Sequence, residues 1–408
     1  MEDGKNGDRD HIHRILSLDG GGLYGLTSAL WLRQLCEQDP EFLRAGDVQL
    51  FAGCSAGALN SLLLAKEPEP REFVLAGGLE NFWRQPGTFS NTNPVTAFWS
   101  LFQVTAWFGT ADFLQLLQAL FGDMTLGDLP NRVLITTFNW TGERNACATM
   151  PRPPAGSPPC DPWSPWTGTP ADVMASSVPD AHWWRPKFFK NFPDRELDRR
   201  CRIVDVAYAA TAPPGMRAIL DGLGDGGTFN ACPCADAVAA VVAEERDKQH
   251  WSDNQPVGDL LDRLHLLSLG VGAKRSAYWL RYFDYSFTQF SLYPTNPLAA
   301  NWYPPGVSVG LDGPTEEAIY ISRQLLGANF HRLNPGLLEV PTLAACIWAR
   351  SPQIRESLIQ QIYAAVQTPV SRQAVRDALD FLKNRWRQEA YYKSDAKSAV
   401  ELGGSAKS

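Results

Sequence analysis

Histidine is scarce in this sequence, and long uninterrupted apolar runs are absent. Only 6 of the 408 residues are histidine, so few positions could supply the imidazole of a catalytic triad. Met1 to Arg14 is polar and charged, and it lacks the apolar segment of a secretory signal peptide. The most apolar stretch, Val95 to Phe121, is interrupted by glutamine and aspartate and is unlike a membrane span. We therefore expect a soluble, cytoplasmic protein, for which peripheral contact with a membrane stays open.

Positive charge is not in excess either. Lysine and arginine number 37 against 44 aspartates and glutamates, which gives a net charge of −7. No long-range field would attract nucleic acid, so we expect no nucleic-acid partner. The hydrophobic fraction of 44% is that of an ordinary globular protein, and the length suits one large α/β domain or two smaller ones.

The eight cysteines lack the paired spacing of a zinc site. Most lie among apolar residues, where buried, reduced thiols are expected. Cys232 and Cys234 form a C-x-C pair, and Cys147 and Cys160 lie in a loop-like stretch. Neither set has the second pair or the nearby histidines that zinc sites use, so we expect no metal.

The chain opens with a strand, a glycine-rich turn and a helix, and then repeats this order. Ile12 to Leu18 and Val48 to Ala52 are apolar and strand-like. Leu23 to Cys36 and Ala58 to Ala65 carry apolar residues at helical spacing. Such a β-α-β-α order predicts a parallel sheet with crossover helices.

Later segments continue the α/β pattern. Strands are expected at Val133 to Phe138, Arg217 to Leu220 and His265 to Leu269, and helices at Arg71 to Arg84, Ala235 to Glu245, Thr315 to Leu326, Gln353 to Val366 and Arg372 to Trp386. Met150 to Pro179 is rich in Pro, Ser, Thr and Gly, which predicts an irregular surface insertion. The aromatic stretch Phe89 to Phe121 is interpreted either as core or as a lid that touches lipid.

The strongest local signal is Gly53-x-Ser55-x-Gly57, between the second strand and its helix. A serine on a sharp strand-to-helix turn projects from the backbone as a nucleophile must, and the glycines allow strand and helix to approach closely. The helix N-terminus adds positive partial charge beside the serine. This position favours a nucleophile turn over a chance match.

A second motif, Asp19-Gly20-Gly21-Gly22-Leu23-Tyr24-Gly25, joins the first strand to its helix. Its amides could bind an anion, either a phosphate or the oxyanion of a tetrahedral intermediate. The same residues satisfy G-x-G-x-x-G, so nucleotide binding is an alternative, although the acidic residue of that fingerprint is missing because the second strand ends in the serine turn. A tight turn without a ligand is the third interpretation.

Asp225-Gly226-Gly227 is the third motif, in which an aspartate beside two glycines could accept the proton of Ser55. The alternative is an ordinary Asp-Gly turn. Asp221 is also followed by glycine and is a rival base. A Ser-His-Asp triad using His250, His265 or His331 is a further alternative, but only one strand-helix unit precedes the serine, unlike α/β-hydrolases.

The three motifs, and the order in which they follow one another along the chain, resemble those of the patatin-like phospholipase family. Secondary features agree: Ala207 to Pro213, Ser268 to Gly272 and Arg332 to Pro335 are similar to that family's alanine-rich helix end, S-L-G-T-G strand end and late R-x-N-P turn. Two positions depart from the pattern. Tyr24 stands where the family has arginine, and Ala231-Cys232-Pro233 replaces an N-x-P sequence.

The resemblance implies a three-layer α/β fold with a mostly parallel central sheet flanked by helices. It implies that Ser55 attacks an acyl carbonyl, that Asp225 takes its proton, and that no metal or organic cofactor takes part. The oxyanion would bind to the amides of Gly20, Gly21, Gly22 and Ala56, with Gly25, Gly53, Gly57, Gly226 and Gly227 as supporting positions.

We therefore expect a lipid acyl hydrolase acting on phospholipids or other acyl esters. The alternative from another class is a catalytically weak lipid-binding or regulatory protein on the same fold. The expected organisation is a polar tail at 1–11, a catalytic domain at 12–335 with the insertion at 150–179, helices at 336–391 and a disordered tail at 392–408.

Overall fold

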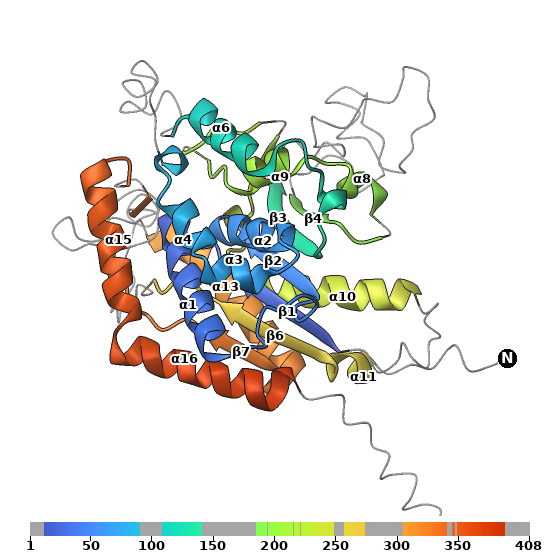
Figure 1. The fold of residues 1–408 in the computed structure, drawn as a ribbon. Coiled ribbons are helices and arrows are strands. Elements are labelled where there is room, and N and C mark those ends of the chain that lie inside the picture. The colour runs from blue at the N-terminus through green and yellow to red at the C-terminus, as the bar shows by residue number, and fades with distance from the viewer. Residues whose placement is uncertain are drawn as a thin grey trace, which may run out of the picture.

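A single mixed sheet organises the molecule (Figure 1). The computed structural model describes residues 12–89, 108–140, 185–193, 195–214, 216–220, 222–248, 257–273, 305–340, 345–346 and 349–387. Its strands are β1 His13–Leu18, β2 Leu50–Cys54, β3 Val133–Asn139, β4 Arg185–Lys190, β5 Leu223–Asp225, β6 Leu264–Leu269 and β7 Phe330–Leu333. The order is β4-β3-β2-β1-β6-β7, with β5 also paired to β3. The polar tails and the proline-rich insertion lie outside the described residues.

Five strands run parallel, and β4 and β5 are antiparallel to β3. The parallel strands β1 and β2 are followed by helices that cross over one face, which is the arrangement that the repeated β-α order predicts. Strands β2 and β6 are buried along their whole length, and this explains their nearly continuous apolar sequences. The predicted mostly parallel sheet is confirmed.

Helices cover both faces of the sheet and complete three layers (Figure 1). One face carries α1 Gly25–Gln38, α2 Ala56–Lys66, α3 Pro70–Leu75, α4 Gly78–Trp83, α6 Thr110–Phe121, α9 Ile203–Ala210, α15 Pro352–Val366 and α16 Pro369–Phe381. The other carries α10 Cys234–Lys248, α11 Val257–Leu261 and α13 Pro305–Leu326, and α8 Glu196–Arg199 lies beyond β4. Alternate strand residues serve the two cores: Leu16 packs on the first face and Ile15 on the second.

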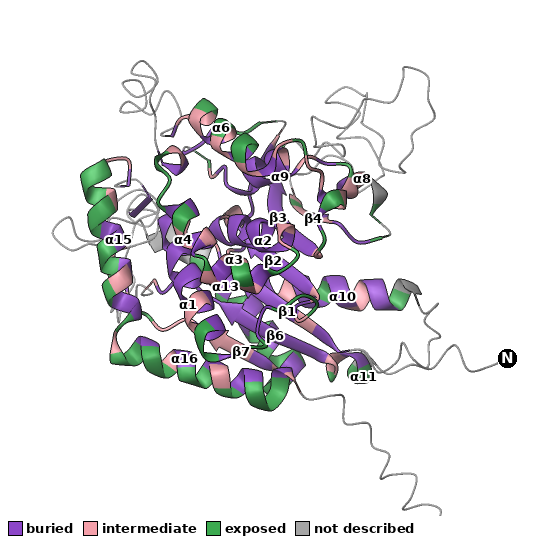
Figure 2. Cartoon of the chain, viewed as in Figure 1, coloured by how far each residue is buried: buried purple, intermediate pink, exposed green. Residues whose placement is uncertain are grey.

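Helices α15 and α16 pack against α1. Each begins with a proline after a hydroxyl cap, since Ser351 and Thr368 accept hydrogen bonds from amides of the first turn. Trp31 of α1 donates its indole hydrogen to Ser371 at 2.9 Å. Figure 2 shows buried residues along the central strands and exposed residues on the outer sides of α15 and α16. No helix in the described ranges is long and apolar enough to cross a membrane.

Two predicted elements were wrong. The stretch from 71 to 84 forms two helices instead of one, because Gly77 between them has a left-handed φ of 78°. Arg217 to Leu220 is not a strand: apart from an isolated bridge between Leu220 and Leu223 it is irregular, and the strand that reaches Asp225 is β5.

The described part of the aromatic stretch belongs to the core. Phe89, Phe108, Phe113 and Phe121 are all at most 5% exposed. Phe113 and Phe121 lie on α6 and pack with the first-face core. The core interpretation therefore holds for these four rings, whereas the residues from 90 to 107 lie outside the described ranges.

The junction of β2 and α2 depends on two glycines at a close crossing. A Cβ added at Gly57 would overlap the carbonyl oxygen of Leu18, at the end of β1, and one at Gly53 would overlap the backbone of Gly57. Backbone atoms cannot move aside as a side chain can, so only glycine allows the helix to lie this close to the strands.

We predict that Gly57→Ala lowers the free energy of unfolding by at least about 2 kcal/mol, because the new methyl group forces the helix away from β1. Chemical denaturation measures this change. Gly258→Ala is the matched control, since a Cβ there meets no atom within 4 Å and alanine favours the helix. Equal stabilities of the two variants would contradict the tight crossing.

Candidate active site

Ser55 is held in a strained backbone conformation at the junction of β2 and α2. Its φ is 49° and its ψ is −118°, and within the described ranges only Leu43 shares a positive φ among non-glycine residues. A non-glycine residue in such a region costs about 1–3 kcal/mol, and the surrounding packing must hold it there. Ser55 precedes the first turn of α2, so its hydroxyl lies beside the positive end of that helix.

Strand β3 brings the aspartate to the serine. Strand β2 pairs with β3 as far as Thr136, which lies opposite Cys54. The next residue of β3, Thr137, lies opposite Asp225 of β5. Because β4 pairs along the other edge of β3, β5 continues the edge that β2 has just left. Residues 54 and 225 therefore become neighbours, although 171 positions separate them in sequence. A Cβ on Gly226 would lie 2.7 Å from the Thr136 carbonyl oxygen, so glycine is needed for this approach.

The two side chains share a short hydrogen bond. Ser55 Oγ donates to Asp225 Oδ2 at 2.6 Å, and the amide of Gly227 donates to Asp225 Oδ1 at 2.7 Å. Asp225 is only 3% exposed, and this burial raises its pKa to about 6, against the lowering effects of Ser55, Gly227 and Arg217. Near neutral pH the carboxylate is ionised and in contact with the serine proton, which is the geometry of a general base and its nucleophile.

Arg217 is a charged residue near this site that the sequence reasoning missed. Its side chain is buried, with the guanidinium carbon 3.7 Å from the ring centre of Phe113. Nη2 donates to the carbonyl oxygen of Thr88, and Nη1 has no hydrogen-bond partner among the described residues. Burial lowers the pKa of Arg217 to about 10, which leaves it a cation at neutral pH. Its charge lowers the pKa of Asp225 through space.

The glycine loop, residues Asp19 to Gly25 after β1, lies directly beside Ser55. A Cβ on Gly20 would lie 3.0 Å from Ser55 Cβ, and one on Gly21 would lie 2.8 Å from a methyl group of Val271. The amide of Gly20 donates to the carbonyl oxygen of Ala231 at 2.8 Å. This amide, one of the four expected to bind the oxyanion, is thus engaged within the protein in this structure. No bond to a described residue engages the amides of Gly21, Gly22 and Ala56.

Tyr24, which replaces the family arginine, serves the core. It is 2% exposed, and its hydroxyl donates to the carbonyl oxygen of Val340 at 2.8 Å. Burial raises the pKa of Tyr24, so the ring stays neutral. Gly25 packs against the indole of Trp83, where a Cβ would overlap the ring. This end of the loop thus carries packing instead of charge.

The other candidate residues lie apart from the pair or outside the described ranges. His265 lies within β6, where burial lowers its pKa to about 4, and His331 on β7 stacks on Phe381. His250 and Asp221 are outside the described residues. Six of the cysteines are described, and all six are buried free thiols; Cys147 and Cys160 lie in the part that is not described.

The comparisons with known proteins point to one family of lipid hydrolases. The family model described as patatin-like phospholipase matches residues 16–238, which include all three motifs. A cGAMP-activated phospholipase of Pseudomonas aeruginosa is 29% identical over 204 residues, or 50% of this chain and 47% of that relative. The chain thus spans about half of that protein's length. Protein teg of Priestia megaterium is 21% identical over 92% of this chain and 99% of its own.

Among solved structures, VipD from Legionella pneumophila covers 90% of this chain and 67% of its own, with a TM-score of 0.34 and 11% identity. That similarity is too low to support an argument about the site. The family model and the phospholipase relative support a lipid hydrolase in general terms. With more than half of its residues matched by the family model, this chain belongs to the patatin-like phospholipase family.

Proposed function

We propose that this protein hydrolyses acyl esters of lipids, with Ser55 as nucleophile and Asp225 as its general base. The observation that carries the proposal is the 2.6 Å hydrogen bond from Ser55 Oγ to a buried carboxylate. The strained turn supports it, because such strain in a non-glycine residue is concentrated at functional sites. Membership of a phospholipase family favours a phospholipid or a related acyl ester as the substrate.

The reaction would run in two halves. Ser55 Oγ attacks the acyl carbonyl carbon while its proton passes to Asp225, and the carbonyl oxygen becomes an oxyanion. As the tetrahedral intermediate collapses, Asp225 returns the proton to the departing alcohol, which leaves an acyl group on Ser55. Water then attacks the acyl-enzyme, gives its proton to Asp225, and releases the fatty acid when the proton returns to Ser55.

The oxyanion would be stabilised by backbone amides. Gly21 and Gly22 of the loop and Ala56 at the start of α2 are the proposed donors, since their N–H groups are not engaged by the described residues. The helix N-terminus adds its partial charge at the same place. Gly20 instead anchors the loop through Ala231. This assignment keeps three of the four donors expected from the sequence.

We predict that Ser55→Ala lowers turnover of a short-chain acyl ester by at least about 10³-fold, since the nucleophile is lost. Labelling by a fluorophosphonate probe is expected to disappear in parallel. Ser61→Ala is the matched control: Ser61 lies on α2 as well, is fully buried, and its hydroxyl has no hydrogen-bond partner in the part of the chain that the structure describes. Turnover in this control should stay within about threefold of the parent, as for a small buried change.

Absence of both labelling and turnover in a folded parent would refute the hydrolase and favour the alternative of a lipid-binding protein. Vesicle binding by that inactive parent would then be the measurement in support of the alternative.

The pH profile gives a further prediction. Because Asp225 must be ionised to act as a base, kcat/KM should fall as the pH drops through about 6, the value to which burial raises its pKa. Arg217→Met removes a cation that lowers this pKa, so the acid limb should move to higher pH. Arg217→Lys should move it less. An unchanged limb in Arg217→Met would mean that another group controls the profile.

Asp225→Asn should stabilise the fold while it abolishes activity. The native pKa of Asp225 exceeds the ordinary value of 3.8, so the native state binds its proton more tightly than the unfolded state does. This carboxylate therefore destabilises the native state increasingly as the pH rises from about 4 to about 6, and by a constant amount above that. We predict that the variant gains up to about 3 kcal/mol at pH 8 and little at pH 4. Thermal unfolding at both pH values checks this, and an equal gain at both would contradict it.

A further inference from the structure

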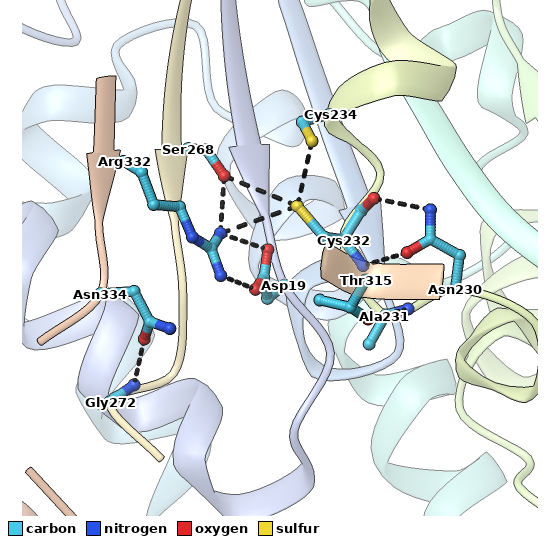
Figure 3. A network of polar contacts seen from close by, with 10 residues as sticks. All are labelled: Asp19, Asn230, Ala231, Cys232, Cys234, Ser268, Gly272, Thr315, Arg332 and Asn334. Carbon is cyan, nitrogen blue, oxygen red and sulfur yellow. Dashed lines mark hydrogen bonds and ion pairs between the residues drawn. The ribbon is translucent and has the colours of Figure 1, made fainter. Parts of the chain in front are cut away.

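A buried ion pair joins Arg332 to Asp19, which immediately precedes Gly20 (Figure 3). Arg332 of β7 donates through Nη1 to Asp19 Oδ1 at 2.8 Å and through Nη2 to Asp19 Oδ2, so the contact is bidentate. Nη1 also donates to Ser268 Oγ on β6 at 2.6 Å. The two charged side chains are 9% and 6% exposed. Burial alone would lower the pKa of Arg332, but Asp19 outweighs it, and that pKa is raised.

Asp19 is the first residue of the loop that would bind the oxyanion. Its amide donates to the carbonyl oxygen of Leu269 at the end of β6, and the next amide, of Gly20, donates to Ala231. The Ala231 amide in turn donates to Thr315 Oγ1 at 3.2 Å. The loop is thus held through the backbone to β6 and to the segment after Asp225, and through one side chain to β7.

The carboxylate of Asp19 needs this partner for an electrostatic reason. It lies two residues before Gly21, and a negative charge there would oppose the oxyanion that the loop is proposed to bind. The bidentate guanidinium compensates this charge and fixes the side-chain direction at both oxygens. A lysine could supply the charge but not the fork, because it donates as a single point.

We propose that Arg332 is a positioning residue for the oxyanion hole, an inference that rests on the proposed function. By holding the Asp19 side chain and compensating its charge, Arg332 keeps the amides of Gly21 and Gly22 directed at the oxyanion. Its guanidinium contacts Asp19, Ser268 and Cys232, so it would act on the oxyanion through the loop. A simple structural ion pair would affect stability alone. The clamp is expected to affect the transition state more than substrate binding.

The test compares Arg332→Met, Arg332→Lys and the double variant D19N/R332M. For Arg332→Met we expect kcat on an acyl ester to fall about 30–100-fold with KM within about threefold, as for loss of oxyanion stabilisation. The affinity for a trifluoromethyl ketone analogue, which forms the oxyanion when bound, should fall in parallel. The double variant carries no uncompensated charge, so it should recover at least about tenfold of the loss. Lysine should give an intermediate kcat.

Arg387→Met is the matched control. Arg387 also pairs with a buried aspartate, Asp39, but at the end of α1. It should lose thermal stability without loss of kcat or of ketone affinity. Should Arg332→Met not fold, D19N/R332M and Arg332→Lys avoid an unpaired buried carboxylate and carry the same comparison against the parent.

Parental kcat and ketone affinity in a folded Arg332→Met would overturn the proposal, as would a double variant no more active than Arg332→Met. A parent that turns over no acyl ester, or one whose turnover survives Ser55→Ala, would instead overturn the proposed function and this inference with it.

Discussion

A carboxylate removed from water beside the Ser55 hydroxyl is the constraint on which the site depends. Burial makes the charge of Asp225 costly, and two short hydrogen bonds, from Ser55 and Gly227, offset part of that cost. The result is a carboxylate more basic than one in water, yet still ionised near neutral pH. A more exposed aspartate would be a weaker base, and a buried one without donors would stay protonated.

Arg217 and Arg332 each interact with an aspartate near Ser55, but through different geometries. Arg217 acts on Asp225 through space without a direct ion pair, so the carboxylate stays available to accept a proton from Ser55. Arg332 instead contacts both oxygens of Asp19, so that carboxylate is held in a bidentate ion pair. One cation tunes a negative charge and the other compensates it. The same residue types thus serve opposite purposes because of the geometry of their contacts.

The sequence predicted the parts of the site that depend on local backbone chemistry. Gly53 and Gly57 flank a strained serine and must lie close to other backbone atoms, so their motif indicates the turn directly. The parallel sheet followed from the repeated β-α order. Contacts between distant residues carry no such local pattern. The bond from Gly20 to Ala231, the buried Arg217 and the pairing of Arg332 with Asp19 therefore required the structure.

Strands β2 and β5 pair one after the other along the same edge of β3, and this pairing fixes the separation of Ser55 and Asp225. The distance between Ser55 and Asp225 is set by which residue of β5 stands opposite Thr137. That choice changes only in whole-residue steps of about 3.3 Å, and a single step turns the side chain to the other face. The register that brings Ser55 and Asp225 together is therefore fixed in whole-residue steps. A one-residue insertion or deletion within β5 would therefore separate the two side chains outright instead of shifting them slightly.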